Sequence, residues 1–207
     1  LLLDVNKLAK GSEYYDLNFD ADCISPDNRW LMYSVDTDGR RIYNIYIKNL
    51  VTGELLNYNI PNVESGAVWA NNSNTILYLR KNMTTLIGEK LYKHILNKNV
   101  KNDKLIYFEK DKTFVNYLYK TKSNKYIVLG HHSTLVSDIQ LLNADNPDQS
   151  LKRFTTRLKK HLYTVGHIGN KFYIVSNWNA KNFSLMKTNE DQTNRKFWKE
   201  IVPNRKT

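Results

Sequence analysis

The sequence predicts an all-β fold, a β-propeller of four-stranded antiparallel blades with about four blades present. Three observations predict it: a fourfold repeat, the same four strands inside each repeat, and very little helical periodicity. An Asn followed by an apolar and aromatic run marks each repeat. The runs begin at Asn28, Asn74, Asn124 and Asn170, which are 46, 50 and 46 residues apart. Four short strands at such a period are typical of propeller blades.

Each repeat carries its four strands in the same order. A short strand comes first, the Asn-anchored run second, an alternating strand third and a more polar strand fourth. The period of two and the β-branched and aromatic residues favour strands over helices. The second strand is apolar on both faces, so we expect neighbouring blades to cover it, whereas the fourth lies at the wetter rim. The predicted strands of the four repeats are 21–24, 28–33, 42–47 and 54–58; 67–69, 74–79, 91–95 and 104–109; 115–119, 124–129, 138–142 and 151–154; and 163–167, 170–175, 183–186 and 196–201.

The start of the chain differs from the repeats. Residues 1–18 form a lead-in, in which the spacing over 2–10 predicts a short turn of helix that ends at Gly11. The chain has only 8 Gly and 4 Pro, so we expect Asn, which tolerates positive φ, to carry many turns. The blade repeats are then predicted at 19–62, 63–111, 112–158 and 159–207.

Two alternatives concern the architecture. A β-sandwich also has short strands at regular spacing, but it does not require the same four strands to recur at a fixed period. Seven blades of about 48 residues would need roughly 340 residues. The chain therefore either closes as a four-bladed ring or forms the opening part of a larger one. Because the sequence begins at Leu1 without Met, we expect it to be a piece of a longer protein.

The composition excludes several classes of protein. Hydrophobic residues make up 41% and charged residues 25%, which is ordinary for a globular protein and unlike a disordered one. No apolar run approaches the roughly 18 residues of a membrane span, so no membrane partner is predicted. Cys23 is the single cysteine, which excludes an intrachain disulfide and predicts a reducing, cytoplasmic location. The five histidines lack the spacing of metal ligands, and no cofactor is predicted.

The sequence contains no recognisable catalytic motif. G-x-S-x-G is absent, and the eight glycines are too scattered for a phosphate-binding loop. The pair His131-His132, close to Ser133 and Asp138, is the best candidate for a general base. We interpret it as an exposed turn between the second and third strands of the third repeat, because no further partner is found. No catalytic, cofactor-binding or metal residue is therefore predicted.

The formal net charge of +11 raises a second functional hypothesis. Lys and Arg cluster at 152–153, at 157–161 and along 195–206, with Phe154, Phe197 and Trp198 close by. Such patches can bind phosphates and stack on bases. A free-standing propeller scaffold that binds a protein or nucleic acid through a basic rim is thus the alternative. The charge is spread over several strands and turns, which makes nucleic acid an unlikely partner.

The sequence also resembles a known family along its whole length. Its stretches resemble, in order, the propeller domain of the oligopeptidase B (protease II) group in the prolyl oligopeptidase family of serine peptidases. One departure is Asn204-Arg205, where the family pattern has His-Arg after the proline. The resembling stretches are 2–9 (LLDVNKLA), 25–29 (SPDNR) with 33–34 and 38–39, 52–56 (TGELL), 69–71 (WAN) with 77–78, 118–121 (LYKT) with 125–127, 141–145 (LLNAD), 172–174 (FYI) with 176–177 and 181–183, and 198–203 (WKEIVP).

This resemblance implies a two-domain enzyme. A seven-bladed propeller would cap an α/β-hydrolase domain that carries the catalytic Ser, Asp and His, and no cofactor is implied. The implied activity is cleavage of short peptides after Lys or Arg, with the propeller excluding folded proteins. The catalytic domain is absent from this chain, which would be catalytically silent alone. Its implied partners are short basic peptides and the missing hydrolase domain.

Two further expectations follow from an incomplete ring of blades. If the alternation holds, Asp22, Asn116 and Thr164 of the first strands line an axial channel, although a one-residue shift would turn them away. Unpaired strand edges and blade faces would favour self-association of the fragment.

Overall fold

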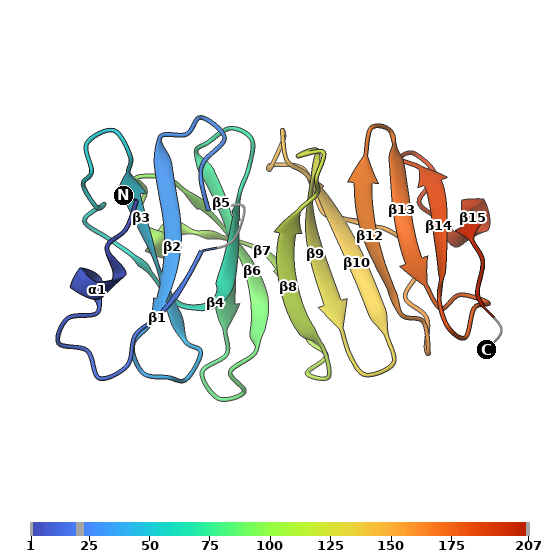
Figure 1. Ribbon diagram of the computed structural model, residues 1–207, viewed down its shortest axis with the longest axis horizontal. Coiled ribbons are helices and arrows are strands. Elements are labelled where there is room, and N and C mark those ends of the chain that lie inside the picture. The colour runs from blue at the N-terminus through green and yellow to red at the C-terminus, as the bar shows by residue number, and fades with distance from the viewer. Residues whose placement is uncertain (1, 20–22, 206–207) are drawn as a thin grey trace. The chain divides into compact units, whose positions relative to one another are not determined.

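The computed structural model describes residues 2–19 and 23–205, and its strands form three antiparallel sheets (Figure 1). The sheets have seven, four and four strands, with the orders β1-β2-β3-β4-β5-β6-β7, β11-β10-β9-β8 and β12-β13-β14-β15. The predicted all-β class is confirmed. The chain divides into two compact units: the first holds residues up to Lys112 together with Tyr117–Tyr119, and the second holds Thr113–Asn116 and the residues from Lys120 onward.

The first unit contains one short helix and the seven-stranded sheet. Each strand of this sheet is antiparallel to the next one along the chain, so the sheet is a continuous meander. Its elements are α1 (Val5–Leu8), β1 (Asp16–Asn18), β2 (Trp30–Asp36), β3 (Tyr43–Asn49), β4 (Ile60–Trp69), β5 (Thr75–Lys81), β6 (Gly88–Ile95), the 3₁₀ turn η1 (Val100–Asn102) and β7 (Lys104–Phe108).

The second unit contains the two four-stranded sheets, except for the part of β8 that belongs to the first unit. Both sheets are again antiparallel meanders. Their elements are β8 (Val115–Lys120), β9 (Tyr126–His132), β10 (Ser137–Asn143) and β11 (Lys152–Arg153), followed by β12 (Tyr163–Ile168), β13 (Lys171–Ser176), β14 (Ser184–Asn189), the 3₁₀ turn η2 (Arg195–Phe197) and β15 (Lys199–Val202).

The predicted lead-in helix is confirmed as α1. Asp4 caps it, because its carboxylate accepts a hydrogen bond from the backbone N–H of Lys7 at 3.2 Å. The chain leaves the helix through Gly11, whose φ of +87° suits glycine. In the parts of the chain that the structure describes, no helix has the length and apolar character needed to cross a membrane.

Asparagine carries many of the turns, as predicted from the shortage of glycine. Asn28 and Asn124, two of the repeat anchors, have φ of +59° and +57° at the turns before β2 and β9. The equivalent turns before β5 and β13 place Ser73 and Gly169 at positive φ. The anchors chosen at 74 and 170 are therefore one residue late, because the left-handed position can be filled by residue types other than Asn.

The second strands form the centre of the packing. All but the first residue of β2 are buried, and β5 and β9 are buried almost throughout. Along β2, Met32 belongs to one apolar cluster and Leu31 and Tyr33 to another, so both faces of the strand are covered. This confirms the prediction for three repeats. It is wrong for β13, which alternates between buried and exposed residues because only one of its faces is covered.

The first repeat departs from the prediction at both of its edges. The predicted fourth strand, 54–58, is reduced to one bridge between Lys48 and Leu55, and the start of β4 pairs with β3 through Ile60 and Ile45. Residues 54–58 are mostly exposed, so little apolar burial holds them against the sheet. β4 continues to pair with β5, and this joins the first two repeats into one sheet.

The first strand of the first repeat was predicted at 21–24, and half of it lies outside the described residues. The backbone N–H of Met32 donates to the Cys23 carbonyl at 2.8 Å, and Ile24 forms a single bridge with Leu31. The other end of β2 pairs with β1, with Leu17 opposite Val35. β1 was not predicted, because three residues are too few to show a period.

The fourth strands of the last two repeats are shorter than predicted. The strand expected at 151–154 is β11, with two residues, and Phe154 beyond it is buried. The strand expected at 196–201 begins only at Lys199, because η2 occupies the residues just before it. Asn194, the N-cap of η2, explains why the strand begins late. Its side chain accepts a hydrogen bond from the backbone N–H of Lys196, which favours a turn over a strand.

The left-handed turn at Asn28 is testable by substitution. Asn28→Val should lower the free energy of unfolding by about 1–2 kcal/mol, because a β-branched residue is strained at positive φ, whereas Asn28→Gly should change it little. Asn74→Val is the matched control, since Asn74 is exposed but is not among the residues at positive φ. Urea unfolding of the three variants checks this, and equal losses for both Val variants would contradict it.

Candidate functional site

The three residues expected to line a channel have different surroundings. Asp22 lies outside the described residues. Asn116 is buried, and its side-chain oxygen lies 2.6 Å from Nδ1 of His131. The prediction for Asn116 is wrong by one step of the strand, since its neighbour Val115 is the exposed residue. Thr164 is exposed on β12, between two buried residues.

His131 was interpreted as part of an exposed turn, and this is wrong. It is fully buried near the end of β9, with Asn116 at one ring nitrogen and the side-chain amide of Gln140, 3.0 Å away, at the other. His132 is the exposed member of the pair. The alternation of the strand explains the difference, because successive side chains point to opposite faces. The His131 side chain therefore forms hydrogen bonds inside the protein and is not accessible to a substrate.

Two of the arginines in the predicted basic clusters neutralise a buried acid. Asp138 is fully buried on β10, with an Oδ2 atom 2.9 Å from Arg157 Nη2 and 3.4 Å from Arg153 Nη2. Burial raises the pKa of its carboxyl, and the two guanidinium groups oppose that shift. Arg157 also lies over the ring of Phe114, 4.3 Å from its centroid. Arg157 is therefore held mainly by internal contacts, whereas the Arg153 side chain is 45% exposed.

A third arginine fixes the protonation state of His161. Arg195 Nη1 lies 2.9 Å from His161 Nδ1, and a guanidinium can only donate, so Nδ1 accepts. The proton of the neutral ring is then on Nε2, which lies 2.9 Å from the hydroxyl of Ser176. Burial and the nearby Arg195 charge lower the pKa of His161 to about 4. Arg195 is itself placed over the ring of Trp178.

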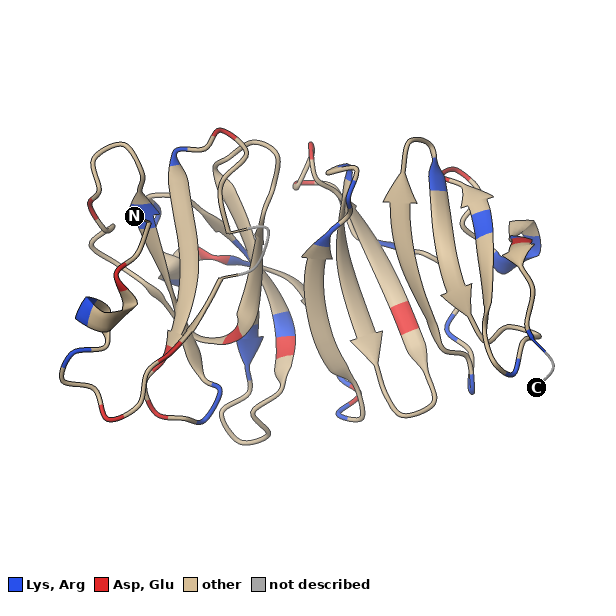
Figure 2. Cartoon of the chain, viewed as in Figure 1, with Lys and Arg blue, Asp and Glu red and all other residues tan. Residues whose placement is uncertain are grey.

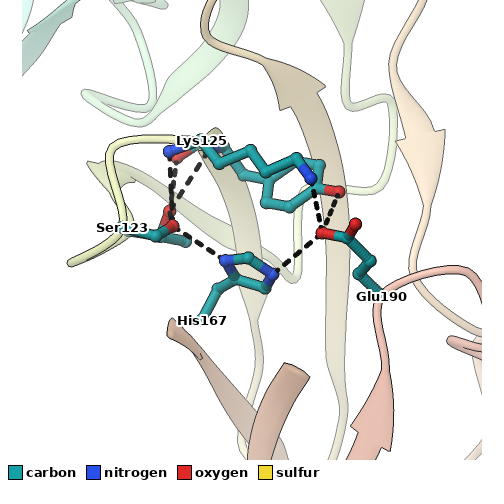
Figure 3. Close-up of polar contacts among 6 residues, drawn as sticks. Ser123, Lys125, His167 and Glu190 are labelled. Carbon is teal, nitrogen blue, oxygen red and sulfur yellow. Dashed lines mark hydrogen bonds and ion pairs between the residues drawn. The ribbon is translucent and has the colours of Figure 1, made fainter. Parts of the chain in front are cut away.

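The most complete polar cluster of the second unit joins Ser123, His167 and Glu190 (Figure 3). Ser123 lies in the turn between β8 and β9, His167 on β12, and Glu190 just after β14. His167 Nδ1 lies 2.8 Å from the Ser123 hydroxyl, and Nε2 lies 3.3 Å from Glu190 Oε2. Lys125 Nζ contacts the same carboxylate oxygen at 2.6 Å.

The electrostatics of this cluster follow from burial and from the Lys125 contact. The hydrogen bond from Lys125 is the main cause of the lowered pKa of Glu190, and the same bond raises the pKa of Lys125. His167 is fully buried, and its burial lowers the pKa of its imidazole against the opposing effect of Glu190. Burial therefore favours the neutral ring, which lies between the Ser123 hydroxyl and the Glu190 carboxylate.

A serine, a histidine and a carboxylate suggest a hydrolase triad, but the surroundings do not support one. The Ser123 hydroxyl is already engaged by the Thr121 hydroxyl at 3.0 Å and by the backbone N–H of Lys125 at 3.3 Å. The N–H of Asn124 donates to the Thr121 carbonyl, so it does not point toward a developing oxyanion. The buried His167 gives a substrate no access. The cluster ties the β8–β9 turn to the following sheet.

A cleft of about 340 Å³ lies beside this cluster. Tyr126 and Glu190 line it together with Lys152, Arg153 and Asp191. Both signs of charge are present, and Arg153 is already paired with Asp138. Figure 2 shows that Lys and Arg are spread over strands and turns rather than gathered on one element. Within residues 2–19 and 23–205, no group of three or more His, Cys, Asp or Glu side chains is placed to hold a metal ion.

The lowered pKa of His161 predicts a dependence of stability on pH. Its unfolded form binds a proton near pH 6.5 and its folded form only near pH 4, so the free energy of unfolding should fall as the pH falls through that window. His161→Gln removes this contribution and should flatten the profile, while exposed His132→Gln should not. Urea unfolding at pH 7 and at pH 4.5 measures the difference, and parallel profiles for wild type and His161→Gln would contradict it.

Comparison with known proteins gives a consistent result. Residues 1–207 match the family model described as the prolyl oligopeptidase N-terminal β-propeller domain. The chain is 35% identical over 206 residues to dipeptidyl aminopeptidase BI of Pseudoxanthomonas mexicana, and 33% identical over 194 residues to protease 2 of Moraxella lacunata. These alignments cover 99% and 90% of the chain, but only 28% and 27% of the two relatives. The chain thus spans less than a third of their length.

Solved structures show the same fold at lower sequence identity. Oligopeptidase B from Leishmania major superposes with a TM-score of 0.91 at 22% identity, covering 99% of this chain and 29% of that one. Oligopeptidase B from Trypanosoma brucei, with covalently bound antipain, gives a TM-score of 0.86 at 21% identity, covering 99% and 28%. The β-propeller prediction and the family resemblance are both confirmed. The chain belongs to the prolyl oligopeptidase family of peptidases and is part of its N-terminal β-propeller domain.

Proposed function

We propose that this chain is part of the gating propeller of a serine oligopeptidase that cleaves short peptides after Lys or Arg. The match of residues 1–207 to the propeller model of a peptidase family carries the proposal. A ring of blades has rigid walls and a narrow axial opening, so it would admit flexible peptides and exclude folded proteins. The chain would select substrates by size and break no bond itself.

The preference for Lys and Arg rests on the resemblance to oligopeptidase B. Two solved oligopeptidase B structures superpose on the chain, and protease 2 is among its relatives. The substrates would be short basic peptides. The relative at 35% identity is named a dipeptidyl aminopeptidase. Assays should therefore include peptides with a free amino terminus as well as peptides with a blocked one.

The reaction itself would take place on a hydrolase domain outside these 207 residues. G-x-S-x-G is absent from the sequence, and the Ser123 cluster lacks a free hydroxyl and an accessible base. An α/β-hydrolase domain would be the principal partner of the propeller. The sheet of β12–β15 exposes Ile168, Tyr173 and Val175 on one face, which suits further burial against another blade.

The alternative, a scaffold that binds a partner through a basic rim, has less support. Arg153 and Arg157 are paired with a buried carboxylate, and Arg195 is engaged by His161 and a backbone carbonyl. A phosphate would have to compete with these contacts for the three side chains. A cytoplasmic location remains a prediction from the single cysteine, and the four blade boundaries remain predictions as well.

The division of labour can be tested with an arginine-containing chromogenic peptide. The 207-residue chain should give no hydrolysis, whereas the whole natural protein that contains it should be active. In that protein Ser123→Ala should keep kcat within about twofold, because its hydroxyl is not the nucleophile. A fluorophosphonate should label a serine outside residues 1–207. Labelling of Ser123, or loss of activity in a Ser123→Ala variant whose urea unfolding is unchanged, would overturn the proposal.

The exposed apolar face of β12–β15 predicts self-association of the isolated chain. Light scattering should detect dimers or larger species, because Ile168, Tyr173 and Val175 leave apolar surface uncovered. Replacing Ile168 and Val175 with Thr should reduce that association while keeping β-strand propensity. A monodisperse monomer of the wild-type chain would contradict the prediction.

A further inference from the structure

A buried carboxylate in the first unit organises two polar chains. Asp103 follows η1, and its side chain is 3% exposed. Its Oδ1 lies 2.7 Å from Nδ1 of the fully buried His94. Its Oδ2 accepts a hydrogen bond from the Tyr78 hydroxyl at 2.8 Å. Because both oxygens are used, this one acid sets the direction of hydrogen bonding in both chains.

The first chain runs from Asp103 through His94 to Tyr58. An ionised carboxylate only accepts, so His94 donates to Asp103 from Nδ1. Its Nε2 lies 3.0 Å from the Tyr58 hydroxyl. The Tyr58 oxygen in turn accepts from the backbone N–H of Asn97 at 2.9 Å. Burial raises the pKa of Tyr58, which keeps its proton in place.

The second chain runs from Asp103 through Tyr78 to Arg80. Arg80 Nη2 donates to the Tyr78 oxygen at 2.8 Å. The guanidinium is also held by two stacked rings, with its central carbon 5.4 Å from the Tyr78 centroid and 5.0 Å from that of Tyr92. These contacts hold the side chain through Nη2 and the two rings. Its Nε is buried without a hydrogen-bond partner and is enclosed by the protein, so the Nη groups are the donors that can face a ligand.

Both chains end at the same cleft, which has a volume of about 550 Å³. Tyr58 and Arg80 line it together with Lys98 and Lys101, and no acidic residue is among its lining. Within the described part of the chain, none of these three cations forms an ion pair with Asp or Glu. The second-unit cleft differs, because Glu190 and Asp191 are part of its wall.

We propose that this cleft binds an oxyanion, a carboxylate or phosphate group, with Arg80 as the fixed donor and Lys98 and Lys101 as mobile cations at the rim. A planar guanidinium with free N–H groups matches the oxygens of either anion. The Asp103 network holds Arg80 in position before the anion arrives, so little side-chain freedom is lost on binding. Free phosphate and an acidic side chain of a peptide both present anionic oxygens to the guanidinium.

The test is calorimetric titration of the whole natural protein at low ionic strength. Inorganic phosphate and a tetraglutamate peptide are the two probes, and a tetraglutamine peptide is the neutral control. Binding of phosphate alone assigns the site to a small free anion, and binding of tetraglutamate alone assigns it to acidic peptide segments. Binding of neither probe, or equal binding of tetraglutamine, would overturn the proposal.

Variants locate the binding in the cleft. Lys98→Gln/Lys101→Gln should weaken it about tenfold, because two of three cations are lost from exposed positions that do not affect folding. Lys159→Gln/Lys181→Gln makes the same change in net charge at exposed positions of the second unit and should change the affinity less than about twofold. Arg80→Lys keeps the charge but loses the planar guanidinium, and should weaken binding; urea unfolding of this variant separates that effect from any loss of stability, because Arg80 also contacts Tyr78 and Tyr92. Equal effects of the two double variants would show that only net charge is sensed.

Discussion

The structure depends on one constraint: a strand that is covered on both faces must present apolar side chains to both, and every polar group enclosed there needs a partner. β2, β5 and β9 meet the first requirement with nearly continuous burial. The second is met by specific pairs, such as the Trp69 indole N–H, which donates to the Cys23 carbonyl at 3.2 Å. A buried group without a partner costs about 1–3 kcal/mol, so this pair helps to fix β4 against the segment before β2 within one sheet.

The buried histidines show how this constraint fixes protonation states. Arg195 can only donate, so His161 must accept at Nδ1; Asp103 can only accept, so His94 must donate there. The two partners carry opposite charge, so Nδ1 accepts in one ring and donates in the other. In both cases the second ring nitrogen is satisfied by a hydroxyl, from Ser176 or Tyr58. Both imidazoles are buried, so their hydrogen bonds position neighbouring side chains and do not contact a substrate.

Local patterns predicted most of the fold because strands and turns are determined within a few residues. The period of two located the second and third strands, and the tolerance of Asn for positive φ identified the turn at Asn28. The short outer strands were misplaced because exposed residues such as those of 54–58 carry little apolar signal. The polar clusters were not predictable, since Ser123 and His167 are 44 residues apart and Lys125 and Glu190 are 65 apart. Their pairing depends on how sheets stack, which no local pattern records.

The same reasoning separates a structural Ser–His–acid set from a catalytic one. In a hydrolase the acid orients Nδ1 and the hydroxyl faces Nε2, and a preorganised oxyanion site lies beside the hydroxyl. Around His167 the order is reversed, with Ser123 at Nδ1 and Glu190 near Nε2. Lys125 also neutralises the acid, so Glu190 is not reserved for stabilising an imidazolium. The three residue types alone would suggest catalysis. The ring nitrogens that face Ser123 and Glu190, and the burial of His167, indicate instead a structural contact between two sheets.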